Sequence, residues 1–143
     1  MTTAGVLGFI GLGVMGEPMC RNLARKSKAT VVAFDERSTP LAALAADGVQ
    51  AAASLAEVAR RTEIVFLCLP GEPQVRSVCL GGSADGGLAA LVKPGQTVVD
   101  MSTCPVALAR DLGQTFGARG IAFADAPIAR TAQAAATARS ASW

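Results

Sequence analysis

Val6-Leu-Gly-Phe-Ile-Gly-Leu-Gly-Val-Met-Gly16 is the stretch of sequence that decides the fold. It begins with a short apolar run that predicts a buried strand, and it ends in a glycine-rich turn. Met19 and Leu23 follow at the four-residue spacing of one helix face, and Pro18 falls in the first turn, where a helix tolerates proline. The stretch therefore predicts a strand, a tight turn and a helix in direct succession.

The turn carries the spacing G-x-G-x-x-G at Gly11, Gly13 and Gly16. Between a strand and a helix, the first glycine permits the tight turn, the second lets the backbone approach a pyrophosphate, and the third lets the helix pack against the strand. The helix N-terminus adds unpaired N–H groups and a partial positive charge, which favour phosphate binding. We therefore predict a dinucleotide-binding turn. Its predicted cofactor-binding residues are Gly11, Leu12, Gly13, Val14, Met15 and Gly16.

A second apolar strand is predicted at 30–35, and it ends in Asp35, about 20 residues after the glycine turn. An acidic side chain at this place can accept both hydroxyl hydrogens of the adenosine ribose. Because the same carboxylate would repel a 2′-phosphate, NAD is favoured over NADP as the cofactor. Arg37 leaves an alternative open, since it either reaches a 2′-phosphate or is a solvated surface charge.

Short apolar runs and helical patterns alternate along the rest of the chain. Ser54 and Glu57 form a capping box at the start of one helix, and Leu108, Leu112 and Phe116 form the apolar stripe of another. Further strands are predicted at 50–53, 63–70, 97–102 and 121–126, and further helices at 40–46 and 72–80. We therefore predict an α/β fold, a Rossmann-type doubly wound parallel sheet with helices on both faces and ligands at the carboxyl ends of its strands.

Composition limits the possible functions. The chain has 143 residues, of which 51% are apolar and 17% charged, as in a globular domain. Histidine and tyrosine are absent, which excludes catalysis by either side chain and any metal site that contains histidine. The formal net charge of +2 is too small to predict nucleic-acid binding.

The cysteines give no sign of a metal or disulfide framework. Cys20, Cys68, Cys79 and Cys104 contain no C-x-x-C pair, and we predict four reduced thiols and no metal. The N-terminus lacks the basic and apolar regions of a signal peptide, and no apolar stretch is long enough to span a membrane. These observations predict a cytoplasmic protein without a membrane partner.

The segment Gly11-Leu-Gly-Val-Met-Gly-Glu-Pro-Met-Cys-Arg-Asn-Leu23 resembles the opening signature of the β-hydroxyacid dehydrogenases. That family includes 3-hydroxyisobutyrate dehydrogenase, tartronate semialdehyde reductase and 6-phosphogluconate dehydrogenase. Met15, Met19, Asn22 and Leu23 match beyond the glycines. The resemblance runs from residue 5 to about 137 and includes three later segments. These are Leu67-Cys-Leu-Pro70, Val99-Asp-Met-Ser-Thr103 and Asp125-Ala-Pro127.

The resemblance implies roles for residues beyond the glycine turn. Leu69, Pro70 and Thr103 would border the nicotinamide side of the cofactor, and Gln74 would lie near the nicotinamide ribose. Ser102 would face the carboxylate of the substrate. A structural alternative stays open for two of them, because Ser102 or Thr103 could be the N-cap of a helix that opens at Pro105.

Two further residues carry separate expectations. Asp100, in the same segment, is expected to be structural. Arg130 stands where the family carries Ser-Gly-Gly, and its planar cation suits a substrate carboxylate or phosphate. The alternative, given the same weight, is that Arg130 is an exposed surface arginine without a ligand.

The lysines do not supply the catalytic group that the family uses. Its general acid/base is a lysine beyond the end of this sequence, and Lys26, Lys28 and Lys93 do not match it. We therefore predict no catalytic residue in the chain, a sheet incomplete at its C-terminal side and no helical second domain. The resemblance implies hydride transfer between a small 3-hydroxy acid and NAD in a full-length parent. The alternative is a non-catalytic dinucleotide-binding module, or one half of a split enzyme.

The last residues depart from the family. A one-base shift in an illustrative coding of the family segment Gly-Thr-Leu-Ser-Ile-Met reads Ala138-Arg-Ser-Ala-Ser-Trp143, as here. The hypothesis is a truncated NAD(P)-binding domain over 1–137 and a frameshifted tail over 138–143. Apolar sheet surface left exposed by such a truncation predicts self-association.

Overall fold

The computed structural model describes residues 5–82 and 86–128. Its strands are all parallel and form one sheet in the order β3-β2-β1-β4-β5-β6. They are β1 (Val6–Ile10), β2 (Thr30–Phe34), β3 (Gln50–Ala51), β4 (Ile64–Leu67), β5 (Thr97–Asp100) and β6 (Ala122–Asp125). The predicted doubly wound parallel sheet is confirmed, with every strand slightly shorter than its apolar run suggested.

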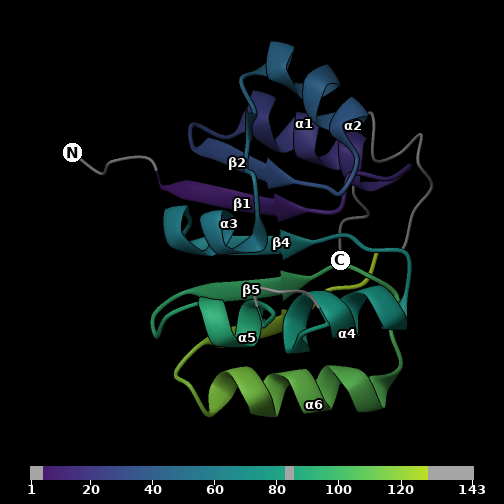
Figure 1. The fold of residues 1–143 in the computed structure, drawn as a ribbon, viewed down its shortest axis with the longest axis vertical. Coiled ribbons are helices and arrows are strands. Elements are labelled where there is room, and N and C mark those ends of the chain that lie inside the picture. Colours follow the sequence, from purple (N-terminus) through teal and green to yellow (C-terminus); the bar gives the residue numbers. More distant parts are fainter. Residues whose placement is uncertain (1–4, 83–85, 129–143) are drawn as a thin grey trace.

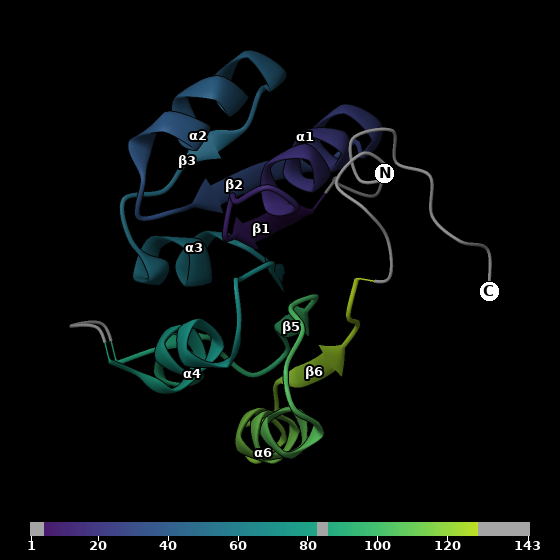
Figure 2. The same cartoon turned by 90° about the vertical axis from the view of Figure 1, so that its right-hand side faces the viewer.

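Helices connect the strands and lie on both faces of the sheet. They are α1 (Gly16–Lys26), α2 (Ser38–Leu44), the short 3-10 helix η1 (Ala45–Asp47), α3 (Leu55–Arg61), α4 (Glu72–Leu80), α5 (Leu88–Leu91) and α6 (Val106–Gly117). In Figures 1 and 2, α1 and α2 accompany β1 and β2, whereas α4, α5 and α6 accompany β4 to β6. No described helix is long and apolar enough to cross a membrane.

Apolar side chains on the two faces of the sheet form two separate cores. On one face, Phe9 and Val31 of the sheet pack with Cys20 of α1 and Leu44 of α2. The opposite core joins the sheet to α3, α4, α5 and α6. It includes Val32, Val58, Val65, Val75, Leu88, Val98, Leu112 and Phe116. Full burial of each large aliphatic or aromatic side chain contributes about 1.5–3 kcal/mol, so this larger core dominates the stability of the fold.

Helices cover the two halves of the sheet to different extents. Along β4, Val65 and Leu67 are buried on the face toward α3–α6, while Ile64 and Phe66 on the other face are only half-buried. β5 shows the same alternation. Cover on both faces is therefore confirmed for β1 and β2. On β4 and β5 this second face is covered only in part, since Phe66 packs against the core with α1 and α2 but stays half-buried.

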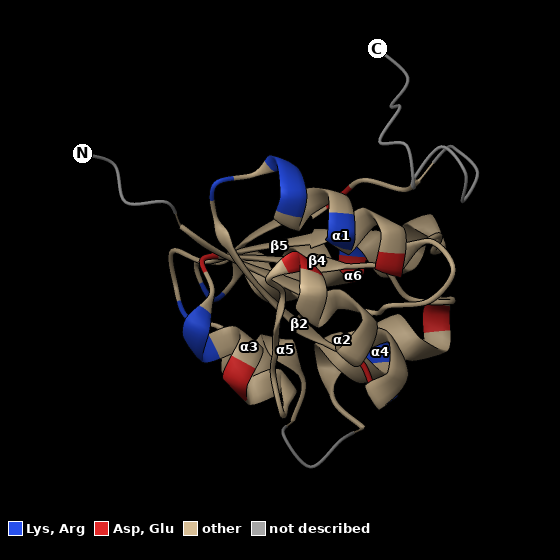
Figure 3. Cartoon of the chain, turned by 90° about the horizontal axis from the view of Figure 1, so that it is seen from above, with Lys and Arg blue, Asp and Glu red and all other residues tan. Residues whose placement is uncertain are grey.

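Local sequence signals are confirmed in detail. The Ser54 hydroxyl accepts a hydrogen bond from the Glu57 N–H at 3.1 Å, and the Glu57 carboxylate accepts one from the Ala53 N–H at 2.6 Å. The Glu57 carboxylate therefore bonds the N–H of the residue before the N-cap, whereas in the usual capping box it bonds the N–H of the N-cap residue itself. Acidic and basic residues are interspersed over the helices (Figure 3), in line with the small net charge.

The chain reverses its direction across the sheet between β1 and β4. From β1 it proceeds to β2 and β3 on one side, and from β4 it proceeds to β5 and β6 on the other. The loops after β1 and β4 therefore diverge, which opens a crevice at the carboxyl ends of the central strands. This crevice is where a doubly wound sheet places its ligand.

Candidate functional site

A cleft of about 1040 Å³ occupies the crevice at the carboxyl ends of the strands. Segments that follow β1, β2, β4 and β5 line it, so residues far apart in sequence meet there. All of the predicted site residues that lie in the described part of the chain are among its lining. These are Gly11, Leu12, Gly13, Val14, Met15, Gly16, Asp35, Leu69, Pro70, Gln74, Ser102 and Thr103. The predicted substrate residue Arg130 lies outside the described residues.

The glycines of the turn serve different spatial needs. Gly11 has φ +96°, and a Cβ there would collide with the Cys68 carbonyl oxygen. A Cβ on Gly16 would collide with the carbonyl oxygen of Gly11. By contrast, a Cβ on Gly13 would meet nothing within 4 Å, because the space beside it is the open cleft. The first and third glycines thus permit close backbone packing, and the second leaves room for a ligand.

The N-terminus of α1 opens onto this room beside Gly13. The 11-residue helix begins at Gly16, and the Glu17 N–H already bonds the Gly13 carbonyl at 3.0 Å. In the rest of the first turn, the Met19 N–H bonds the Met15 carbonyl at 3.3 Å and Pro18 has no N–H, which leaves the Gly16 N–H for a ligand at the positive end of the helix dipole. A pyrophosphate therefore fits the residues present, because the open space, this N–H and the favourable potential coincide.

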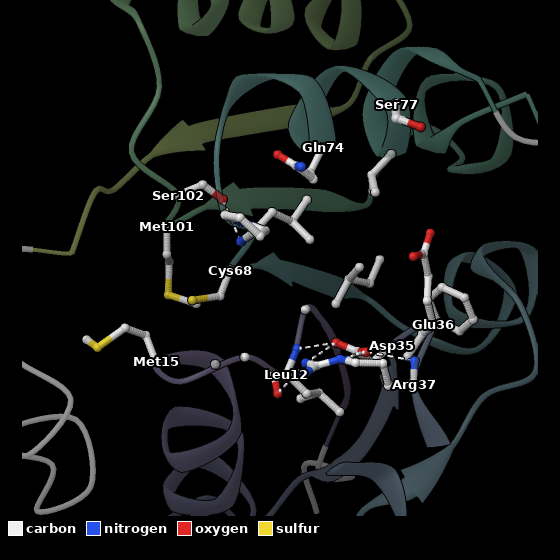
Figure 4. A pocket seen from close by; sticks show the side chains of 18 of the residues that line it. Leu12, Met15, Asp35, Glu36, Arg37, Cys68, Gln74, Ser77, Met101 and Ser102 are labelled. Atoms are coloured by element: carbon white, nitrogen blue, oxygen red, sulfur yellow. Dashed lines mark hydrogen bonds and ion pairs between the residues drawn. The ribbon is translucent and has the colours of Figure 1, made fainter. Parts of the chain in front are cut away.

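Asp35 follows β2 directly and lies beside the glycine turn (Figure 4). Its carboxylate accepts hydrogen bonds from the backbone N–H groups of Leu12 and Arg37, both at 2.8 Å. The Arg37 side chain donates to the same carboxylate from Nε at 3.1 Å and from Nη2 at 3.4 Å. Burial raises the pKa of Asp35, but the hydrogen bonds from Arg37 and Leu12 outweigh it and leave that pKa below its usual value. The group is therefore a carboxylate at neutral pH.

On the other side of the cleft, Ser102 connects the loops after β4 and β5. Its hydroxyl accepts a hydrogen bond from the Leu69 N–H at 2.9 Å, and its own N–H donates to Asp100 at 2.9 Å. Ser102 is 3% exposed and Asp100 is 1% exposed. Burial raises the pKa of Asp100 despite the hydrogen bonds from Ser102, and the Asp125 charge raises it further. The expected structural role of Asp100 agrees with this geometry.

Ser102 and Thr103 do not cap the following helix. α6 begins at Val106 with Pro105 at the N-cap position and no side-chain hydrogen bond there, so the capping alternative is wrong. The Ser102 hydroxyl is instead engaged by Leu69, although the residue lines the cleft. Thr103 is exposed at the cleft, as is Gln74 on the first turn of α4. Contact of Ser102 with a substrate stays a prediction.

Several residues that line the cleft were not predicted from the sequence. Cys68 and Met101 extend sulfur atoms toward the same part of the cleft as Met15 (Figure 4). Ser77 of α4 lies at the opposite end of the cleft (Figure 4), and its neighbour Val78 is also among the lining residues. Cys68 directly follows β4 and Met101 directly follows β5, but the predicted strands at 63–70 and 97–102 included both residues, so their place at the carboxyl ends was missed. Ser77 and Val78 carried no comparable signal, since they lie in the second half of a helix.

No nucleophile or metal site emerges among the described residues of the cleft. The cysteines are free thiols, as predicted. Burial raises the pKa of Cys68 to about 11, so this cleft thiol is neutral at physiological pH. No cluster of three metal-ligating side chains occurs in the described ranges. No lysine is present among the described lining residues either.

The sheet order, the glycine turn and the cleft define a Rossmann-type dinucleotide-binding domain. The family model described as the NAD binding domain of 6-phosphogluconate dehydrogenase matches residues 6–141. The chain belongs to this family, and it is an NAD(P)-binding domain of the hydroxyacid dehydrogenase type. The predicted resemblance is therefore confirmed.

Named relatives support the same assignment. 2-(Hydroxymethyl)glutarate dehydrogenase of Eubacterium barkeri is 37% identical over 122 residues, which are 85% of this chain and 39% of that protein. The structure of Mycobacterium tuberculosis 3-hydroxyisobutyrate dehydrogenase with L-serine is 29% identical, with a TM-score of 0.83 over 95% of this chain and 44% of that one. The structure of Psf3 with NADP+ and 2-OPP is 27% identical, with a TM-score of 0.85, and the match covers 92% of this chain and 45% of that one. The chain thus spans about two-fifths of the length of its curated relatives.

Proposed function

We propose that the chain binds NAD in this cleft, with the pyrophosphate beside Gly13 and the N-terminus of α1. The adenosine ribose then lies at Asp35, and the nicotinamide end extends toward Met15 and the loops after β4 and β5. On that side Leu69, Pro70, Gln74 and Thr103 contact the cofactor. The observation that carries this proposal is the open space beside Gly13, at a helix N-terminus in the crevice where the sheet reverses direction.

Asp35 supports NAD over NADP. Its lowered pKa keeps it charged at neutral pH, so it accepts hydroxyl hydrogens and repels a 2′-phosphate. The relative Psf3 binds NADP+, and both cofactors therefore belong in the binding experiments.

When bound, a nicotinamide cofactor supplies hydride transfer to or from a carbon atom. The proposed reaction of a longer parent protein is the interconversion of a small 3-hydroxy acid and its carbonyl product. In this chain the glycine turn holds the cofactor, and Met15, Cys68 and Met101 exclude water beside it. Ser102 keeps the β4 and β5 loops in place, and Arg130 is proposed to bind the substrate acid. No described lining residue is suited to transfer the substrate proton, so we expect the isolated chain to bind cofactor without turnover.

A glycine pair tests the proposal. Gly13 and Gly117 both leave open space for a Cβ, but only Gly13 lines the cleft. We expect Gly13→Ala to weaken NADH binding about 10-fold or more by crowding the phosphates, and Gly117→Ala to bind as the wild type does. The free energy of unfolding of both variants should stay within about 1 kcal/mol of that of the wild type, or rise, because neither position strains an alanine. NADH fluorescence titration and urea unfolding supply the measurements. A folded wild type without saturable binding, or equal affinity in the Gly13 variant, contradicts the proposal.

A further inference from the structure

The carboxylate of Asp35 has all of its acceptor sites in use. Two carboxylate oxygens offer about four lone-pair sites. The backbone N–H of Leu12 takes a site on Oδ2, and the backbone N–H of Arg37 takes one on Oδ1. The guanidinium of Arg37 takes the remaining two, with Nε on Oδ1 and Nη2 on Oδ2. The ribose diol that is proposed to bind Asp35 would also donate two hydrogens, so the guanidinium and the diol need the same sites.

The guanidinium is the exchangeable partner of Asp35. The Arg37 side chain is 63% exposed, whereas that of Asp35 is 11% exposed and held by the two backbone donors. A further bond from Nη2 to the Leu12 carbonyl at 3.1 Å places the guanidinium across the entrance to the carboxylate (Figure 4). When Arg37 swings into solvent, its side-chain bonds are lost and both backbone bonds to Asp35 remain. Water then solvates the guanidinium, so this movement is weakly opposed.

We propose that Arg37 competes with the adenosine ribose for Asp35 and thereby sets the balance between NAD and NADP. An unphosphorylated ribose must displace the guanidinium before both hydroxyls can bond the carboxylate. A 2′-phosphorylated ribose keeps only its 3′-hydroxyl as a donor. Its phosphate is an anion to which the guanidinium can donate two parallel hydrogen bonds. The inference rests on the proposed function, because it needs the cofactor in this cleft.

The surrounding charges support a role in selectivity. Glu36 lines the same rim, and Glu17 is close enough for its charge to favour the charged form of Arg37. Without Arg37, a 2′-phosphate would meet the carboxylates of Asp35 and Glu36 with no cation beside them among the described lining residues. Arg37 therefore weakens the discrimination that Asp35 alone would impose. It lowers the affinity for NAD and raises the affinity for NADP.

The experiment compares the dissociation constants of NADH and NADPH by fluorescence titration of the full chain. In Arg37→Met, which keeps an unbranched apolar side chain, we expect NADH to bind about 2- to 5-fold more tightly. NADPH should bind about 10-fold or more weakly. Arg76→Met is the matched control: Arg76 is also exposed and ion-paired, to Glu72 on α4, but it does not line the cleft. Arg37→Gln is the second variant, and thermal unfolding establishes that each variant is folded.

The outcomes separate this inference from the function on which it rests. Tighter NADH and weaker NADPH binding in both Arg37 variants, with no change in the Arg76 variant, support it. Unchanged or weaker NADH binding overturns the competition, and unchanged NADPH binding overturns the role toward the 2′-phosphate. A folded wild type that binds neither cofactor overturns the proposed function itself.

Discussion

Two aspartates occupy comparable places in the two halves of the sheet and have opposite surroundings. Asp35 follows β2, lines the cleft and is paired with the exposed Arg37. Asp100 ends β5, is 1% exposed and bonds Ser102 and the thiol of Cys104. The pKa of Asp35 lies below its usual value and that of Asp100 lies above it. The same side chain is thus available to a ligand in one half and part of the structure in the other.

The difference depends on where each aspartate stands relative to the end of its strand, and the two positions differ by one residue. Asp100 is the last residue of β5 and lies on the same face as Val98, which packs in the core with α3–α6. Asp35 comes one residue after β2 has ended, where the chain turns out of the sheet. An acidic residue that follows a strand is therefore free to bind a ligand, whereas one inside the strand is as buried as the face of the sheet on which it lies. The following predictions test this division, from the largest expected effect to the smallest.

Removal of the buried carboxylate should have the largest effect on stability. Asp100→Ala leaves the Ser102 N–H and the Cys104 thiol without their acceptor, and we expect the free energy of unfolding to fall by about 2–4 kcal/mol. Urea unfolding measures the loss. Asp111→Ala, on the exposed surface of α6, is the control and should change stability by less than about 0.5 kcal/mol. Equal losses in the two variants would remove the distinction between the aspartates.

Substitution of Asp35, the carboxylate that lines the cleft, should change binding instead. Asp35→Asn has one acceptor oxygen and no charge, so we expect NADH to bind about 10-fold more weakly. NADH titration of this variant is compared with that of Glu36→Gln, which removes a neighbouring charge from the same rim. Similar losses in both variants would mean that general charge matters and that Asp35 has no specific role.

The Ser102 hydroxyl should contribute to stability through the Leu69 loop. Ser102→Ala leaves the Leu69 N–H without its partner, and the expected loss is about 1–2 kcal/mol of unfolding free energy. Thr103→Ala, at the neighbouring exposed position, should lose less than about 0.5 kcal/mol in the same urea experiment. If Ser102→Ala is as stable as the wild type, the hydrogen bond to Leu69 does not hold the loop.

The two aspartates should also respond oppositely to pH. Because the pKa of Asp100 is raised in the folded chain, its contribution becomes less favourable as pH rises above about 4. The stability of the wild type relative to Asp100→Asn should therefore fall between pH 4 and 7. The pKa of Asp35 is lowered, so its contribution is present above about pH 4 and is lost as pH falls further. Urea unfolding at several pH values checks both signs, and parallel curves for the wild type and Asp100→Asn would refute the first.

Short-range patterns predicted most of the fold and half of the site. The G-x-G-x-x-G spacing predicted the turn from β1 into α1, and Ser54 with Glu57 predicted the start of α3. Asp35 was predicted from its place after an apolar run. These signals work because each depends on a few neighbouring residues whose geometry is local. The partner of the Ser102 hydroxyl could not be predicted, because Leu69 lies 33 residues away on another loop.

The sequence by itself determined the class of fold, the glycine turn and the family, since all three depend on spacing along the chain. Only the tertiary structure decided that Ser102 bonds Leu69 and that Arg37 lies across Asp35 and the Leu12 carbonyl. It also decided that one face of β4 and β5 is only half-buried. These features depend on which strands are neighbours and on the direction in which each loop leaves the sheet. Both are set by the packing of the whole domain, beyond the reach of any local pattern.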